Sequence, residues 1–137
     1  MTPKNKRNLL IVEDDNGFAE TLMMTLQLMN CNVFEVVSNA EDAIPKAKET
    51  RPDLIIMDIF LAGSMDGITA GKLIEQTLGI PVLYITGYRE KAAFLEGQGV
   101  IPLLKPFDPN DLRAAIGVIF YRADLQNKIN RRHLPRE

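Results

Sequence analysis

The chain has 137 residues, of which 46% are hydrophobic and 25% charged, and its formal net charge is -2. This length and apolar content suffice for one contiguous core, so we expect a single domain. The slightly acidic balance gives no overall attraction to nucleic acid or to anionic membranes, so neither is an expected partner. The chain has no apolar run of membrane-spanning length and a single cysteine, Cys31, which together favour a reducing, cytoplasmic location.

The first predicted strand and helix are separated by a run of acids. Residues 9–12 are a compact apolar run that ends at three consecutive acids, residues 13–15, which indicates a buried strand with acids at its carboxyl end. Apolar residues then recur at helical spacing through residues 16–30. Either Asp15 or Asn16 can cap the first turn of this helix.

A second strand and helix lead to an apolar run that contains one carboxylate. Residues 33–37 are β-branched and aromatic, and the Ser-Asn pair after them can cap a helix that begins at Ala40. Pro45 lies past the first turn of that helix, so we expect an irregularity there. Residues 54–60 are apolar except for Asp58, which indicates a central strand covered on both faces.

The remaining part of the chain continues this alternation. The elements expected there are a helix over 68–78, a strand over 81–85, a short helix near 90–96, a strand over 100–104 and a helix over 109–127. Pro102 interrupts the last strand, and Asp108 followed by Pro109 is a strong helix start. We expect the domain to cover residues 1–127 and residues 128–137 to be a polar, basic tail, in which His133 has no catalytic or metal-binding role.

Five strands that alternate with five helices predict an α/β fold. The strands are expected to form a parallel sheet with right-handed crossovers and helices on both faces. In such an open sheet, the carboxyl ends of the strands form the ligand crevice. The side chains that follow these ends are therefore the first candidates for chemistry.

Four of the strand ends carry chemically capable side chains. Glu13 and Asp14 close the first strand, Asp58 the third, Thr86 the fourth and Lys105 the fifth. Three carboxylates held close together repel one another, and a divalent cation or an added proton offsets this repulsion. An all-oxygen site without histidine suits Mg²⁺. The lysine and the threonine hydroxyl would bind the oxygens of a phosphoryl group as it forms on a carboxylate.

These residues, in this order, resemble the receiver domain of bacterial two-component response regulators over essentially residues 8 to 125. An acidic pair, a single aspartate, a threonine and a Lys-Pro pair stand at the ends of the first, third, fourth and fifth strands, as in that family. Residues 65–67, Met-Asp-Gly, match the family's loop before the third helix. The resemblance implies the flavodoxin-like fold, a five-stranded parallel sheet in the order 2-1-3-4-5.

The resemblance also implies a role for each site residue. Asp58 is expected to accept a phosphoryl group from a histidine kinase or a histidine phosphotransferase. Asp14 and Asp58 are expected to ligate Mg²⁺ directly, together with the backbone carbonyl of Phe60, and Glu13 is expected to act mainly through water. Asp15 is an accessory acid or a helix cap. On this interpretation the protein catalyses its own aspartyl phosphorylation and dephosphorylation and turns over no metabolite.

One position departs from the family pattern. Many receivers carry Tyr or Phe three residues before the lysine, and this chain has Pro102 there. Residues 84–88, Tyr-Ile-Thr-Gly-Tyr, are similar to a subgroup with a Phe-Ala-Thr-Gly-Tyr type motif, which also lacks the usual aromatic residue. Tyr88 is therefore the candidate mobile ring, although it could simply pack over the loop, and Gly87 leaves the loop conformationally free.

The output of the protein is expected to be contact with another protein. No output segment follows the last helix in this sequence, so we expect a stand-alone receiver that binds its partner through the fourth helix, fifth strand and fifth helix. Formation of a homodimer through the last helices is left open. A rival hypothesis is a receiver-fold binding module whose signalling does not depend on phosphorylation. A magnesium-dependent phosphatase would need a general acid beside its nucleophile, and Ile59 and Phe60 offer none.

Overall fold

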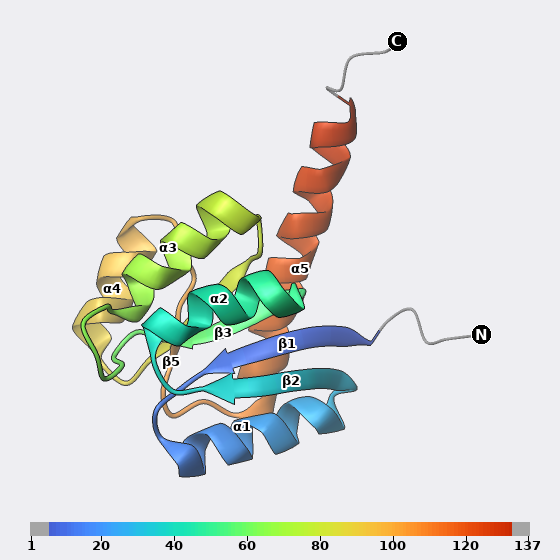
Figure 1. Cartoon of the computed structure of the whole chain (residues 1–137). Helices are drawn as coiled ribbons and strands as arrows, with labels where there is room; N and C mark the ends of the chain where they lie inside the picture. Colours follow the sequence, from blue (N-terminus) through green and yellow to red (C-terminus); the bar gives the residue numbers. More distant parts are fainter. Residues whose placement is uncertain (1–5, 133–137) are drawn as a thin grey trace.

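The computed structural model describes residues 6–132 and confirms the predicted alternation of strands and helices. The strands form one parallel sheet in the order β2-β1-β3-β4-β5. The elements are β1 (Arg7–Val12), α1 (Asn16–Leu28), β2 (Cys31–Val37), α2 (Ala40–Thr50), β3 (Leu54–Asp58), α3 (Gly67–Leu78), β4 (Val82–Thr86), α4 (Arg89–Gly97), β5 (Leu103–Leu104) and α5 (Pro109–Arg132) (Figure 1).

The central strands are buried because helices cover both faces of the sheet. Successive side chains of a strand point to opposite faces, so an unbroken apolar run such as that of β3 supplies two cores at once. Ile55 and Met57 pack on one face with α2 and α3, whereas Leu54 and Ile56 pack on the other face with α1 and α5. The predicted double coverage is therefore confirmed.

Aspartate and asparagine side chains fix where three helices begin. Asp15, Asn39 and Asp66 precede α1, α2 and α3, and each accepts a hydrogen bond from the backbone N–H three residues later. These caps satisfy backbone donors that have no partner within the helix. All three helices therefore start at the edge of the sheet where the strands end.

The structure differs from the expectation at β5, at Pro45 and at the end of α5. β5 is confined to Leu103–Leu104, because Pro102 has no N–H to donate to the neighbouring strand. α2 continues without a break through Pro45. α5 extends to Arg132 rather than ending near residue 127, and its last turn carries basic side chains, which suit the negative end of the helix dipole.

The far end of α5 projects from the body of the domain (Figure 1). Part of the expected tail, residues 128–132, is thus helical, while His133 lies outside the described residues. None of the helices in the described range is long and apolar enough to cross a membrane.

Candidate functional site

The side chain of Lys105 joins two of the predicted acids. Its Nζ lies 2.7 Å from Glu13 Oε1 and 3.2 Å from Asp58 Oδ2. Glu13 follows β1, Asp58 ends β3 and Lys105 follows β5, so the contact links three strand ends that are far apart in the sequence. The predicted convergence at the carboxyl edge of the sheet is present for these three side chains.

Both acids are withdrawn from solvent. Glu13 is 1% exposed and Asp58 is 6% exposed. Burial raises the pKa of Glu13, and the hydrogen bond from Lys105 opposes this rise. Burial also disfavours the charge of Lys105, but its hydrogen bond to Glu13 and the charges of both acids outweigh that effect, so its pKa is raised. The lysine therefore remains a cation between two acids.

Backbone N–H groups hold the remaining carboxylate oxygens. The N–H of Asp15 donates to Glu13 Oε2 at 3.1 Å, and the N–H of Phe60 donates to Asp58 Oδ1 at 3.1 Å. Asp14, which is exposed, accepts a hydrogen bond from the N–H of Ala62 at 3.3 Å. The carboxylates are thus oriented by the loops that follow β1 and β3.

The acids satisfy the chemical requirements of a hard divalent cation. One carboxylate oxygen from each of Glu13, Asp14 and Asp58 can be chosen so that the three lie within 4.8 Å of one another. This donor set is entirely oxygen and has an exposed side at Asp14, which suits an ion that keeps several water ligands. The side chain of Asp15 caps α1 instead of joining this group.

Thr86 is fully buried, and its hydroxyl is engaged by the loop that follows β4. Its Oγ1 accepts a hydrogen bond from the backbone N–H of Tyr88 at 3.1 Å. Tyr88 is 54% exposed, and its ring packs on the ring of Phe60, with ring centroids 4.3 Å apart. The two aromatic rings therefore connect the loop after Thr86 with the loop after Asp58.

Sequence reasoning missed the aromatic support beneath the lysine. Lys105 Nζ lies 4.1 Å from the centroid of the Phe18 ring, and Phe107 meets this ring edge-on. A cation over a ring face is stabilised electrostatically, which helps to hold the lysine in place. Helical periodicity over residues 16–30 places Phe18 among the apolar residues of a helix, and nothing in the local sequence indicates that Lys105, which follows β5, will lie over its ring.

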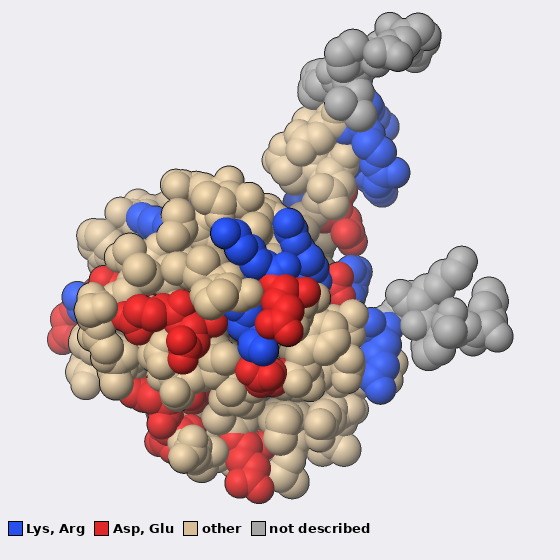
Figure 2. All heavy atoms as spheres, viewed as in Figure 1, with Lys and Arg blue, Asp and Glu red and all other residues tan. Residues whose placement is uncertain are grey.

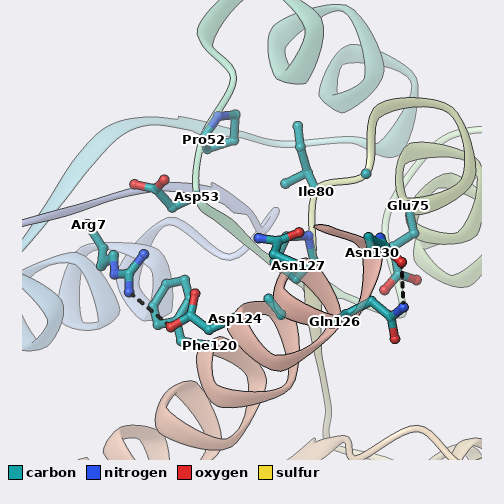
Figure 3. A pocket seen from close by; sticks show the side chains of 13 residues that line it. Arg7, Pro52, Asp53, Glu75, Ile80, Phe120, Asp124, Gln126, Asn127 and Asn130 are labelled. Atoms are coloured by element: carbon teal, nitrogen blue, oxygen red, sulfur yellow. Dashed lines mark hydrogen bonds and ion pairs between the residues drawn. The ribbon is translucent and has the colours of Figure 1, made fainter. Parts of the chain in front are cut away.

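A groove lies elsewhere on the molecule, along the projecting part of α5 (Figure 3). Its volume is about 560 Å³, and Asp53, Glu75, Asp124 and Arg7 are among the residues that line it. None of the predicted site residues lines this groove. Acidic side chains also gather on the side of the body toward which the strand arrows point, while basic side chains lie along one side of the projecting part of α5 (Figure 2).

Known proteins share both this fold and this sequence pattern. The chain is 31% identical over 123 residues to the alkaline phosphatase synthesis transcriptional regulatory protein PhoP of Bacillus subtilis, covering 87% of this chain and 50% of that protein. It is 32% identical over 125 residues to the phyllosphere-induced regulator PhyR of Methylorubrum extorquens, covering 88% and 46%. The chain therefore spans about half the length of these curated relatives.

A solved structure of a receiver domain is similar to this chain in both fold and sequence. The signal receiver domain of a modulated diguanylate cyclase from Desulfovibrio desulfuricans superposes with a TM-score of 0.80 at 29% identity, covering 89% of this chain and 99% of that one. The family model of the response regulator receiver domain matches residues 9–117. The acidic cluster is typical of the magnesium site of receivers, which take phosphoryl groups from histidine kinases. The chain thus belongs to the response regulator receiver domains of two-component signal transduction.

Proposed function

We propose that this chain is a phosphorylation-dependent switch in which Asp58 accepts a phosphoryl group from a phosphohistidine of a histidine kinase or histidine phosphotransferase. The strongest support is the position of the Lys105 ammonium group. Its Nζ lies 2.7 Å from Glu13 Oε1 and 3.2 Å from Asp58 Oδ2. A buried carboxylate with a cation beside it can carry the added charge of a phosphoryl group without large rearrangement.

In the proposed reaction, a carboxylate oxygen of Asp58 attacks phosphorus as the P–N bond to the imidazole breaks. Lys105 neutralises charge on the phosphoryl oxygens, and the Phe60 N–H keeps the Asp58 carboxylate oriented. Mg²⁺, held by Asp14, Asp58 and the Phe60 carbonyl with Glu13 acting through water, would supply further charge neutralisation.

The signal leaves the site through Thr86 and Tyr88. When the Thr86 side chain moves so that its hydroxyl donates to a phosphoryl oxygen, the displacement of Oγ1 breaks the hydrogen bond that this oxygen accepts from the Tyr88 N–H. The Tyr88 ring, packed on Phe60, then becomes free to move.

Gly87 has open space around it, and Pro102 occupies the place of the usual aromatic residue. We therefore assign the chain to the Phe-Ala-Thr-Gly-Tyr type subgroup.

The proposed output is contact with a protein partner through α4, β5 and α5. Exposed apolar side chains on and between these elements support this assignment: Phe94, Ile101, Val118 and Tyr121. A second copy of the chain is an alternative occupant of the same surface. The short β5 limits the pairing at this edge of the sheet, which suits a surface that changes with the phosphorylation state.

Pro102 favours a second candidate function, a receiver-fold binding module whose contacts do not depend on phosphorylation. With proline there, the usual ring rotation cannot occur. Amide NMR spectra recorded with Mg²⁺, with and without acetyl phosphate, distinguish the two candidates. Shifts that extend from residue 86 through α4 and β5 support the switch, whereas shifts confined to residues 13–15 and 58–62 support the binding module.

The chemistry itself is tested by intact mass after incubation with Mg²⁺ and acetyl phosphate. Wild type is expected to gain one phosphoryl group, and Asp58→Ala is expected to gain none. Asp53→Asn is the matched control, because Asp53 lies just before the other end of the same strand and accepts an N–H from Asn8. An equal gain in Asp58→Ala, or no gain in wild type, would contradict the proposal.

A further inference from the structure

The loop that joins β3 to α3, residues 59–66, is closed at its base. The Gly67 N–H donates to the carbonyl of Ile59 at 3.1 Å, and the Ile59 N–H donates to the carbonyl of Ile85 at 3.0 Å. A Cβ at Gly67 would fall on the carbonyl oxygen of Asp58, so glycine alone allows this approach. These contacts fix both ends of the loop but leave its middle to be held by something else.

A side chain from a different element holds the middle of the loop. Glu41 Oε1 accepts a hydrogen bond from the Met65 N–H at 2.6 Å and another from the Ser64 hydroxyl at 3.0 Å. Gly63 has a φ of +114°, and a Cβ there would come within 2.7 Å of Glu41 Oε2. The loop is thus folded around the Glu41 carboxylate.

Glu41 holds the loop as an ionised acceptor. It is the second residue of α2, a helix that packs beside α3. Its own backbone N–H, the Met65 N–H and the Ser64 hydroxyl lower its pKa. Hydrogen bonds to an ionised acceptor are shorter and stronger than those between neutral groups.

A second carboxylate that bonds to the middle of the loop belongs to a candidate metal ligand. Asp14 accepts the Ala62 N–H at 3.3 Å, a longer contact than that of Glu41 with Met65. Asp14 is also one of the clustered acids, whereas Glu41 is not. A cation that attracts the Asp14 carboxylate competes with Ala62, so of these two carboxylates only Glu41 holds the loop independently of the metal.

We propose that Glu41 is a positioning residue that holds the β3–α3 loop, and with it the Phe60 carbonyl, in place for Mg²⁺. This inference rests on the proposed function, because it requires Mg²⁺ to bind at Glu13, Asp14 and Asp58. Glu41 touches neither the metal nor the phosphoryl group in this account. Its effect is on the affinity for the ion.

Asp42 provides a matched control for the charge of Glu41. Both acids lie in the first turn of α2, where a negative charge stabilises the helix dipole. The side chain of Asp42 bonds to Asn39 and not to the loop. Asp42→Asn therefore removes a charge from the same turn and leaves the contacts with Ser64 and Met65 in place.

The test is an NMR titration of the full chain with Mg²⁺, followed through backbone amide shifts, for wild type, Glu41→Ala, Glu41→Asp and Asp42→Asn. Because Glu41 holds the loop that carries the Phe60 carbonyl, the Mg²⁺ dissociation constant is expected to rise about tenfold in Glu41→Ala, as it does when the support of a metal ligand is lost. Glu41→Asp keeps the charge but has a shorter reach, and it should weaken binding too. Asp42→Asn should bind like wild type.

Two further readouts separate positioning from general destabilisation. Hydrogen exchange at the Met65 amide should accelerate in both Glu41 variants and not in Asp42→Asn. The Mg²⁺ concentration that gives half the maximal rate of phosphorylation by acetyl phosphate should rise in both Glu41 variants and should match wild type in Asp42→Asn. Wild-type affinity in both Glu41 variants, or equal losses in Glu41→Ala and Asp42→Asn, would overturn the inference and leave the proposed function intact. Absence of Mg²⁺ binding by wild type would overturn both.

Discussion

The two ends of the sheet both carry acids with a cation beside them, but in different surroundings. At the carboxyl end, Lys105 contacts Glu13 and Asp58 at 2.7 and 3.2 Å, and both acids are almost fully buried. At the amino end, Arg7 and Asp124 are 3.8 Å apart, with side chains 41% and 59% exposed (Figure 3). Charge alone does not distinguish the two ends.

Burial and connectivity make the difference. An exposed ion pair is screened by solvent and contributes little, whereas removal of one partner from a buried pair leaves an uncompensated charge. The carboxyl end also joins three strands through one lysine, while the amino end joins one strand to one helix. Substitutions should therefore have unequal effects at the two ends.

The largest effect is expected for Lys105→Met. It leaves two buried carboxylates without their cation, so the free energy of unfolding in metal-free buffer at neutral pH should fall by about 3 kcal/mol. Phosphorylation by acetyl phosphate should slow by about 100-fold, because a group that stabilises the developing charge is lost. Urea denaturation and intact-mass time courses measure both quantities. A variant as stable and as reactive as wild type would remove the distinction between the two ends.

A smaller loss is expected for Gly67→Ala. The added methyl group would overlap the carbonyl oxygen of Asp58 and push the loop away from β3, at a cost of about 2 kcal/mol. Gly117→Ala is the control, because this glycine lies within α5 with open space around it and should gain about 0.5 to 1 kcal/mol. Urea denaturation compares the two variants. A loss at Gly117 as large as that at Gly67 would show that packing against Asp58 is not the cause.

Arg7→Met is the counterpart of Lys105→Met at the amino end. The substitution removes an exposed ion pair with Asp124. It also removes the contact of the guanidinium group with the Phe120 ring, whose centroid lies 4.3 Å from Arg7 Cζ. The expected loss is about 1 kcal/mol or less, and it should shrink at high salt. Phosphorylation should remain at the wild-type rate. A loss equal to that of Lys105→Met would contradict the comparison.

Glu75→Gln should have the smallest effect, visible only as a pH dependence. Burial raises the pKa of Glu75, and the hydrogen bond from Tyr84 partly offsets this rise. An acid with a raised pKa in the folded state binds its proton more tightly there, so wild type loses stability as pH rises above the ordinary value of 4.5. The glutamine variant lacks this loss, and solvent keeps the difference below about 1 kcal/mol. Melting temperatures are measured for both proteins from pH 4 to 8, and a difference between them that does not change with pH would contradict this assignment.

The parts of the structure that follow from local pattern could be predicted from the sequence. The apolar run around Asp58 identified a central strand, and the residues after the strand ends identified Glu13, Asp58 and Lys105 as neighbours. Periodicity and strand ends are local features, and the parallel topology brings them together.

The parts that depend on distant partners could not be predicted in this way. Neither the ring of Phe18 beneath Lys105 nor the contact of Glu41 with Met65 has a local signal, because each joins elements far apart in the chain. α5 continues past the predicted end near residue 127, because residues 128–132 are mostly polar but contain neither proline nor glycine. Pro102 in the sequence indicates that β5 is interrupted. The length of β5 could not be predicted, because it depends on pairing with β4.

The central claim is that the buried aspartate at the end of β3 carries the phosphoryl group, and site mapping tests it most directly. Wild type is incubated with Mg²⁺ and acetyl phosphate, reduced with borohydride, which converts an aspartyl phosphate to homoserine, and digested for tandem mass spectrometry. The account predicts homoserine at position 58 and unmodified aspartate at positions 14 and 15. Homoserine at position 14 or 15, or at none of the three, would contradict it.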